Sequence, residues 1–376
     1  MHGLCRALAG LGHEVHVFTT SVDGTGDSPV PHGVPIDLDG VKIWYFRSPL
    51  LRRLYWAPGM RKALAGKVSS FDVVHLHSIF LWPTWAAARE ARKRNVPYVL
   101  SPRGMLEKDL VRRRSRLVKS AWLALIERRN LEGAALVHFT SEREREEAAR
   151  FGYRFRAVAI EPNGVELPGD DQARSLAEPI DAATGPSPEI AAAMRQPLPY
   201  FLFLSRISWK KGLDRLVDAL ALVPSVRLVV AGNDDEGYWP RVWAIAEAKG
   251  IAGRIVRVGE IGAADKAALF GGALALVLPS YSENFGNVVL EAMAAGCPVV
   301  VTPEVGAAEV VQRAGAGLVV EGNPEKLGGA LRALAGDRDI RAAMGIRGQA
   351  AAAELSWSNV ARAMAAMYGA VLGSKR

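Results

Sequence analysis

Two glutamates, Glu283 and Glu291, stand eight residues apart and are the carboxylates best placed to do chemistry. The pattern around them predicts a buried strand over 274–278 and a helix over 287–295. Glu283 therefore falls in the strand-to-helix loop, and Glu291 falls about one turn into the helix. Ligands of an open α/β sheet bind at this edge, and the first amides of a helix attract anions. We therefore expect these carboxylates to hold hydroxyl groups, as carbohydrates offer, beside a bound anion.

Two cations, Arg206 and Lys211, flank the loop after a second predicted strand, 200–204. That loop also lies at the carboxyl end of its strand. Fixed cations there can stabilise the charge that develops on a departing phosphate group, and they need no metal to do so. We accordingly predict no metal ligands. An exposed basic loop is the alternative interpretation.

The elements that position these residues alternate between strand and helix, which predicts parallel sheets in two α/β domains. We expect a first domain over 1–167, a linker over 168–199 and a second domain over 200–355. A C-terminal helix over 356–376 could pack back on the first domain. Further predictions are a loop over 21–40, a short helix at 189–195, and a basic helix over 108–130.

Composition fits two domains of ordinary size, because the chain has 376 residues and a mass of 40.5 kDa. Hydrophobic residues make up 49% and charged residues 23%, as in globular proteins. No apolar run reaches the roughly 18 residues of a membrane-spanning helix, and the first residues do not resemble a signal peptide. We expect Cys5 and Cys297 to be buried thiols and the protein to be cytoplasmic.

Positive charge is concentrated in the first half, where residues 1–165 hold 26 Lys and Arg against 16 Asp and Glu. The stretches 50–67 and 108–130 interleave arginines with Trp, Tyr and Leu, a composition typical of membrane-interface surfaces. No nucleic-acid motif accompanies this charge. We therefore favour peripheral contact with an anionic membrane over nucleic-acid binding, and solvated helix faces remain the simpler alternative.

Taken together, the motifs of the second half resemble the nucleotide-sugar domain of the family-four retaining glycosyltransferases, also called glycosyl transferases group one. The residues that carry the resemblance are Ser205-Arg206, Lys211-Gly212, Glu283 and Glu291 with Phe285-Gly286 between them, and Ala295-Gly296-Cys297-Pro298-Val299. The resemblance is strong over 200–320 and looser over 1–165. It implies an α/β fold of two facing Rossmann-like doubly wound domains (GT-B type). The first of these domains lacks its usual first strand and glycine-rich turn.

The resemblance also implies a role for each motif residue. Glu291 would hold the ribose hydroxyls of the donor, and Glu283 would lie at the donor sugar. The backbone amides of Phe285, Gly286 and Asn287 would contact the sugar and the phosphates. The strand end Val258-Gly259-Glu260 would hold the base, largely through its backbone. Lys211 is preferred over Lys210 because Lys-Gly is the pairing of the family. The donor would be a UDP- or GDP-sugar with no other cofactor, and the acceptor a saccharide or polyprenyl-linked saccharide in exopolysaccharide or cell-envelope synthesis.

In the first domain, many family members carry a histidine in the loop after the strand equivalent to 98–100. Arg103 occupies that loop here. Either Arg103 binds a donor phosphate or an acidic acceptor, or His77 makes the sugar contact instead. The sequence does not decide between them.

Three other functions remain to be weighed. A sugar-nucleotide epimerase of the same architecture would need acid and base carboxylates in both domains, and the first domain offers no candidate. A nicotinamide dehydrogenase would need a GxGxxG turn after a strand, and the sequence has none. An inactive binding subunit is a third possibility, because the first strand and its turn are missing. The donor nucleotide, the sugar, the acceptor and the oligomeric state are left open by the sequence.

Overall fold

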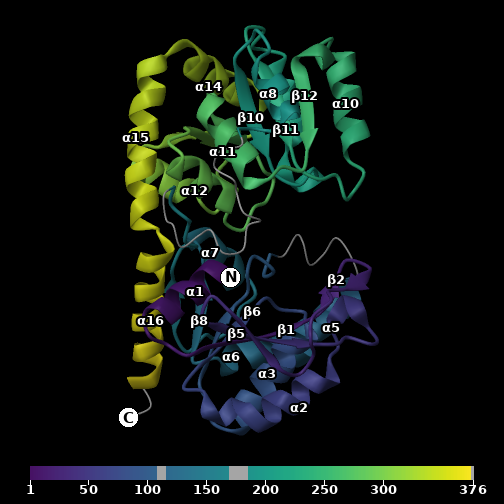
Figure 1. The fold of residues 1–376 in the computed structure, drawn as a ribbon, viewed down its shortest axis with the longest axis vertical. Helices are drawn as coiled ribbons and strands as arrows, with labels where there is room; N and C mark the ends of the chain where they lie inside the picture. The colour runs from purple at the N-terminus through teal and green to yellow at the C-terminus, as the bar shows by residue number, and fades with distance from the viewer. Residues whose placement is uncertain (108–115, 169–184, 374–376) are drawn as a thin grey trace. The chain divides into compact units, whose positions relative to one another are not determined.

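The computed structural model describes residues 1–107, 116–168 and 185–373 (Figure 1). Contacts divide the chain into two compact units, one of residues Met1–Pro162 with Trp357–Arg376 and one of residues Asn163–Ser356. Among the described residues, no helix is long and apolar enough to cross a membrane. Each unit is an α/β structure.

The second unit is built on a six-stranded parallel sheet with the order β12-β11-β10-β13-β14-β15. Its strands are β10 (Tyr200–Leu204), β11 (Arg227–Ala231), β12 (Ile255–Gly259), β13 (Leu276–Leu278), β14 (Val299–Val301) and β15 (Gly317–Val319). Its helices are α8 (Pro188–Met194), α9 (Leu213–Leu220), α10 (Trp239–Ala248), α11 (Ala263–Gly272), α12 (Asn287–Ala294), α13 (Ala308–Ala314), α14 (Pro324–Gly336) and α15 (Arg338–Glu354). The predicted strands over 200–204 and 274–278 and the predicted helices over 189–195 and 287–295 are confirmed, with ends that differ by at most two residues.

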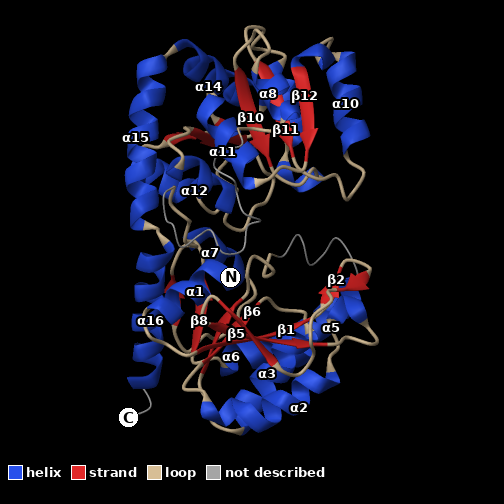
Figure 2. Ribbon diagram, in the orientation of Figure 1, coloured by secondary structure: helices blue, strands red, loops and turns tan. Residues whose placement is uncertain are grey.

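Helices cover both faces of this sheet (Figure 2). Successive side chains of a strand point to opposite faces. In β11, Leu228 and Val230 therefore enter one core with α9, α10 and α14, while Val229 and Ala231 enter the other with α8, α11 and α12. Burial on both faces explains why the strands are continuous apolar runs. It also leaves only the strand ends open to a ligand.

The first unit holds two hydrogen-bonded main sheets, ordered β1-β5-β4 and β6-β7-β8-β9, and a small hairpin, β2-β3. Its strands are β1 (Val15–Thr20), β2 (Val22–Asp23), β3 (Gly26–Asp27), β4 (Pro35–Leu38), β5 (Val41–Phe46), β6 (Val74–His77), β7 (Tyr98–Ser101), β8 (Leu136–Phe139) and β9 (Val158–Ile160). Its helices include α1 (His2–Gly10), α2 (Pro58–Lys67), α3 (Trp82–Lys93), α5 (Arg116–Trp122), α6 (Arg128–Gly133), α7 (Glu142–Ala149) and α16 (Trp357–Gly373). Within the described ranges, no strand joins β1 to β6.

Two predictions for this unit were wrong. The segment 21–40, predicted as a loop, contains β2, β3 and β4, and β4 pairs antiparallel with β5, so the sheets are not all parallel. The connection is the two-residue turn Asp39-Gly40, where φ is 53° and 77°. Positive φ at both positions is what a tight hairpin turn requires, and Asp-Gly is a preferred sequence for it.

The predicted helix over 108–130 is described from Arg116 onward, since 108–115 lie outside the described residues. It is interrupted by a π-helical turn over Leu123–Glu127 before α6 begins. Of the predicted linker, residues 169–184 also lie outside the description. The part around α8 belongs to the second unit, because Ile190 and Ala193 are buried in its core.

The final helix, α16, packs within the first unit. Val360, Ala361 and Met364 form a small core with Leu4 and Leu8 of α1. Gly3 permits this contact, because a Cβ there would lie 2.3 Å from the Trp357 indole nitrogen. Residues 374–376 of the predicted C-terminal helix lie outside the described residues.

Candidate active site

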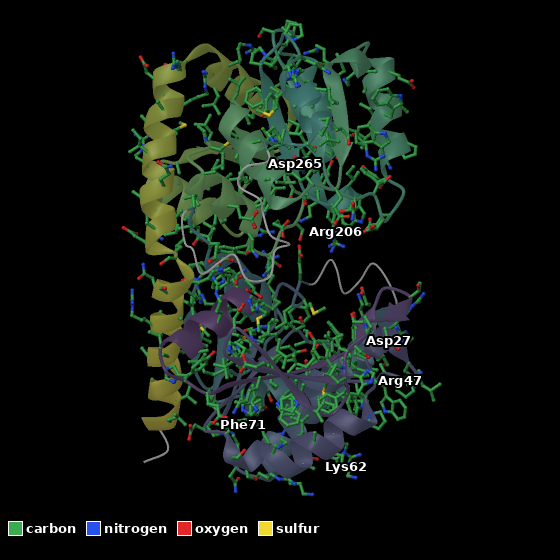
Figure 3. The ribbon with its side chains drawn as sticks, in the orientation of Figure 1. Asp27, Arg47, Lys62, Phe71, Arg206 and Asp265 are labelled. Carbon is green, nitrogen blue, oxygen red and sulfur yellow. The ribbon has the colours of Figure 1, made fainter. Side chains whose placement is uncertain are left out.

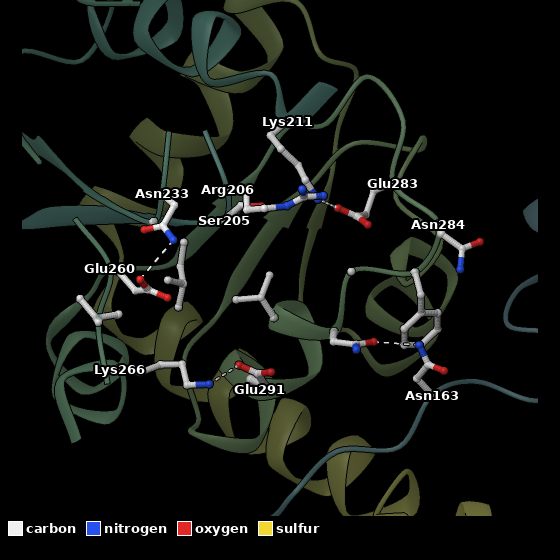
Figure 4. A pocket seen from close by; sticks show the side chains of 17 residues that line it. Asn163, Ser205, Arg206, Lys211, Asn233, Glu260, Lys266, Glu283, Asn284 and Glu291 are labelled. Carbon is white, nitrogen blue, oxygen red and sulfur yellow. Dashed lines mark hydrogen bonds and ion pairs between the residues drawn. The ribbon is translucent and has the colours of Figure 1, made fainter. Parts of the chain in front are cut away.

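A pocket of about 490 Å³ opens at the carboxyl edge of the six-stranded sheet (Figure 4). Its wall comes from the loops that follow β10, β11, β12 and β13, together with the start of α12. The lining residues that bear on function are Asn163, Ser205, Arg206, Lys211, Asn233, Glu260, Ile261, Lys266, Glu283, Asn284, Phe285, Gly286, Asn287 and Glu291. Four adjacent strand ends thus contribute to one site, as the doubly wound architecture dictates.

The loop that carries Glu283 is held by backbone bonds to the segment after β14. Glu283 donates its N–H to the Glu304 carbonyl at 3.1 Å, and the Phe285 carbonyl accepts from Ala307 at 2.8 Å. Gly286 caps α12 with φ of 89°, a value that L side chains rarely adopt. This backbone orients Glu283 and presents the first amides of α12 to the pocket.

Glu283 forms an ion pair with Lys211, which comes from the short helical turn Trp209–Lys211 after β10. Both side chains are largely sequestered, with exposed fractions of 16% for Lys211 and 17% for Glu283. The two loops also share a backbone bond, since Tyr281 donates its N–H to the Lys210 carbonyl at 2.7 Å. The sequence predicted both residues in the site but not their pairing.

The backbone directly after Lys211 requires a glycine, Gly212. Its φ is 67°, and a Cβ at this position would lie 2.0 Å from the Pro279 carbonyl oxygen. No side chain can be placed there without separating the loop of Lys211 from the loop of Glu283. The glycine therefore allows the close approach that pairs these two residues.

Arg206 is exposed at the surface of the second unit (Figure 3). It makes no hydrogen bond or ion pair within the part of the chain that the structure describes. Its backbone is nevertheless fixed, because Ser205 donates to the Ala231 carbonyl at 3.1 Å and Ile207 donates to that of Asn233 at 2.7 Å. Gly232 admits this contact, since a Cβ there would lie 2.0 Å from the Ser205 carbonyl oxygen.

A second ion pair lies elsewhere in the pocket, where Lys266 Nζ is 2.8 Å from Glu291 Oε2. Figure 4 shows this pair on the opposite side of the pocket from Arg206, Lys211 and Glu283. Lys266 was not predicted as a site residue. Its position near the start of α11, the helix that follows β12, brings it to the same edge of the sheet.

The predicted base-binding strand end is arranged differently from the sequence expectation. Val258 is buried in the core, and the Gly259 carbonyl accepts a bond from the Gly232 N–H at 2.6 Å. Glu260, the third residue of the predicted strand end, lines the pocket together with Ile261. The Glu260 carboxylate accepts a bond from the Asn233 amide at 3.2 Å.

Asn287 also lies in the pocket lining, at the first residue of α12. Its side-chain oxygen accepts a bond from the Asn163 amide at 2.9 Å. Phe285 is buried beneath the loop and Gly286 is packed, so both face the pocket chiefly through backbone. The structure thus brings together eight of the predicted second-half residues, all except Val258 and Gly259.

The two predicted residues of the first unit, His77 and Arg103, contact each other. Arg103 donates from Nε and Nη2 to His77 Nδ1 at 3.2 and 3.0 Å. Burial and the nearby guanidinium hold the pKa of His77 well below its ordinary value, so the ring is a neutral acceptor. Arg103 itself has a left-handed backbone, with φ of 56°.

A buried hydrogen-bond chain links four elements of the first unit, β6, β7, β8 and α16. His75 bonds to the Tyr368 hydroxyl of α16 and to the Ser101 hydroxyl, both at 2.7 Å. Ser101 in turn lies 2.7 Å from His138 Nδ1. Burial lowers the pKa of His138 to about 4, so this ring too is neutral at pH 7. These contacts fix α16 to the sheet.

Comparison with known proteins identifies the family. The sequence matches the model of the glycosyl transferases group 1 over residues 191–351 and that of the glycosyl transferase 4-like domain over residues 1–164. The chain belongs to the group 1 glycosyltransferases. It is therefore an enzyme of the glycosyl-transferring class, and every lining residue of the pocket except Asn163 lies within the segment that matches the first model.

Individual relatives of this glycosyltransferase agree with the assignment. A D-inositol 3-phosphate glycosyltransferase of Jonesia denitrificans is 27% identical over 402 aligned residues, which cover 97% of this chain and 88% of the relative. Among solved structures, sucrose-phosphate synthase of Thermosynechococcus elongatus superposes with a TM-score of 0.76 at 22% identity, covering 99% of this chain and 92% of that one. Anabaena HepE in complex with UDP-glucose gives 0.69 at 18% identity, covering 95% and 100%. At these identities the structures show the fold, which is the GT-B arrangement of two Rossmann-like domains.

Proposed function

We propose that the chain transfers a sugar, with retention of anomeric configuration, from a UDP- or GDP-sugar to a saccharide or lipid-linked saccharide. The observation that carries the proposal is one pocket, in a chain of this family, whose lining includes the cations Arg206 and Lys211 and the carboxylates Glu283 and Glu291. A nucleotide-diphospho-sugar offers the matching groups, namely two phosphates between two sets of hydroxyls. The Anabaena relative solved with UDP-glucose supports a UDP-linked donor.

The charges of the pocket fit a diphosphate. Glu283 balances Lys211, so Arg206 supplies the uncompensated positive charge on that side of the pocket. A diphosphate placed there competes with Glu283 for the Lys211 ammonium. That competition frees the Glu283 carboxylate to accept hydrogen bonds from hydroxyls of the donor sugar.

The proposed reaction breaks the bond between the anomeric carbon and the diphosphate oxygen and forms one from that carbon to an acceptor hydroxyl oxygen. The acceptor proton passes to the departing phosphate, so no protein base is required. Arg206 and Lys211 stabilise the charge that gathers on the diphosphate, which is the role a divalent metal would otherwise fill. Attack and departure on the same face of the sugar give retention.

For the acceptor side we propose that Arg103, held by neutral His77, binds an anionic group of the acceptor. We also propose peripheral contact with an anionic membrane, in support of exopolysaccharide or envelope synthesis. Leu50 and Leu51, each 64% exposed, precede Arg52 and Arg53, a pairing of apolar and basic groups suited to a lipid interface.

A thermal-shift screen across UDP- and GDP-sugars tests the donor proposal. A ligand present at 100 times its Kd stabilises the folded state by about 2.7 kcal/mol, which raises Tm measurably. We expect a donor of one nucleotide class to raise Tm of the wild type, and Arg206→Ala and Lys211→Met to abolish the shift. Arg313→Ala is the matched control, because Arg313 is an exposed arginine of α13 outside the pocket lining.

The screen can also contradict the proposal. If no donor shifts the wild type at millimolar concentration, the pocket is not a nucleotide-sugar site. If Lys211→Met and Arg206→Ala shift as far as Arg313→Ala, the two cations have no part in donor binding.

A further inference from the structure

The Lys266–Glu291 pair is unlike the other ion pair of the pocket. Lys266 Nζ lies 2.8 Å from Glu291 Oε2, and each side chain is 35% exposed, about twice the exposure of Lys211 and Glu283. Exposed pairs of this kind contribute little to folding stability. A ligand can therefore share or rearrange the pair at small cost.

The position of Lys266 is also unfavourable for a lysine on electrostatic grounds. It is the fourth residue of α11, close to the helix end where the backbone dipole disfavours a cation. Glu291 lies on a different helix, α12, so the pair is not a local helix-surface contact. Both residues line the pocket, on the side away from Arg206 and Lys211 in Figure 4.

We propose that Lys266 and Glu291 together hold the ribose cis-diol of the donor, which makes Lys266 a specificity residue for ribonucleotides. This inference rests on the proposed function. Each hydroxyl of a diol both donates and accepts a hydrogen bond. The carboxylate accepts hydrogen bonds from the hydroxyl groups, and the ammonium donates a hydrogen bond to a hydroxyl oxygen, which a carboxylate alone cannot do. Glu291 Oε1 and two protons of the Lys266 ammonium supply these bonds while the pair itself stays intact.

Calorimetric titration with UDP, GDP and their 2′-deoxy and 3′-deoxy forms tests the inference. We expect Lys266→Met to weaken binding of the ribonucleotide that the wild type prefers by about tenfold, the size of one hydrogen bond to a charged group. The affinity of Lys266→Met for the deoxy forms should differ much less from that of the wild type. The ratio of ribonucleotide to deoxyribonucleotide affinity should therefore be smaller in the variant. A general structural defect would not produce that difference between ligands.

Lys249→Met is the matched control. Lys249 pairs with Asp218 at 3.0 Å in the same unit, with exposed fractions of 39% and 34%, and neither residue lines the pocket. It should bind all nucleotides as the wild type does.

Three results would overturn the inference. Wild-type affinities in Lys266→Met mean that the lysine makes no contact with the ligand. An equal loss for ribose and deoxyribose forms means that it contacts the phosphate or the base instead. If the wild type binds no nucleotide, the proposed function fails as well, and that outcome is distinct because it does not depend on the variant.

Discussion

Replacing Gly212 with alanine should separate the two loops that form the proposed diphosphate site. The alanine must adopt φ of 67°, a left-handed conformation that costs an L residue about 1–2 kcal/mol. Its Cβ would lie 2.0 Å from the Pro279 carbonyl oxygen, and real Cβ atoms do not approach closer than 3.0 Å. The loops must therefore move apart by about 1 Å, and a displacement of that size can reduce catalysis about 100-fold. We expect Gly212→Ala to lose both stability and donor affinity.

Gly250→Ala separates the two effects. Gly250 follows α10 with the same φ of 67°, but no atom lies within 4 Å of a Cβ placed there. The free energy of unfolding of Gly250→Ala, measured in urea, should fall only by the conformational cost of about 1–2 kcal/mol. Its donor affinity should equal that of the wild type. If Gly212→Ala matches Gly250→Ala in both stability and donor affinity, the close approach of Gly212 to Pro279 is not needed to form the site.

Two further predictions concern buried groups of the first unit. Burial lowers the pKa of His138 to about 4 in the folded state. Between pH 6.5 and 4 this histidine is therefore protonated in the unfolded chain but not in the folded one. The free energy of unfolding should fall by up to about 3 kcal/mol as the pH is lowered through this range. Urea unfolding at several pH values should show a smaller fall in His138→Gln, and identical pH profiles would contradict the argument. Glu127, whose pKa is raised by burial, accepts the Phe80 N–H and the Trp122 indole N–H, both at 2.8 Å. Glu127→Ala leaves both donors unsatisfied and should lower the free energy of unfolding by about 2–5 kcal/mol. The control Glu132→Ala, at a more exposed carboxylate, should lower it by less than about 1 kcal/mol. Equal losses in urea unfolding would show that the hydrogen bonds to Glu127 do not stabilise the fold.

Much of the second unit could be predicted because its strands are buried on both faces. The run from Leu274 to Leu278 is a continuous apolar stretch closed by Pro279, and the strand that it predicts is found as β13, Leu276–Leu278. In the first unit the same reasoning missed β4. The signal was present in Asp39-Gly40, but the glycines and prolines nearby favoured a loop.

The pairing within the site could not be predicted, because it depends on how distant loops meet. Lys211 and Glu283 are 72 residues apart, and Lys266 and Glu291 are 25 apart on different helices. Gly212 and Gly232 were visible in the sequence only as ordinary turn residues beside the motifs. Their function as points of close backbone approach becomes clear only with Pro279 and Ser205 in place.

Proton NMR of donor cleavage, with the donor that stabilises the protein, tests whether the pocket carries out sugar transfer with retention. We expect release of the nucleoside diphosphate, and the sugar product that forms first should have the anomeric configuration of the donor. Lys211→Met should lose this activity. Release with inverted configuration would contradict the proposed reaction. Equal release by Lys211→Met would contradict the assignment of the site.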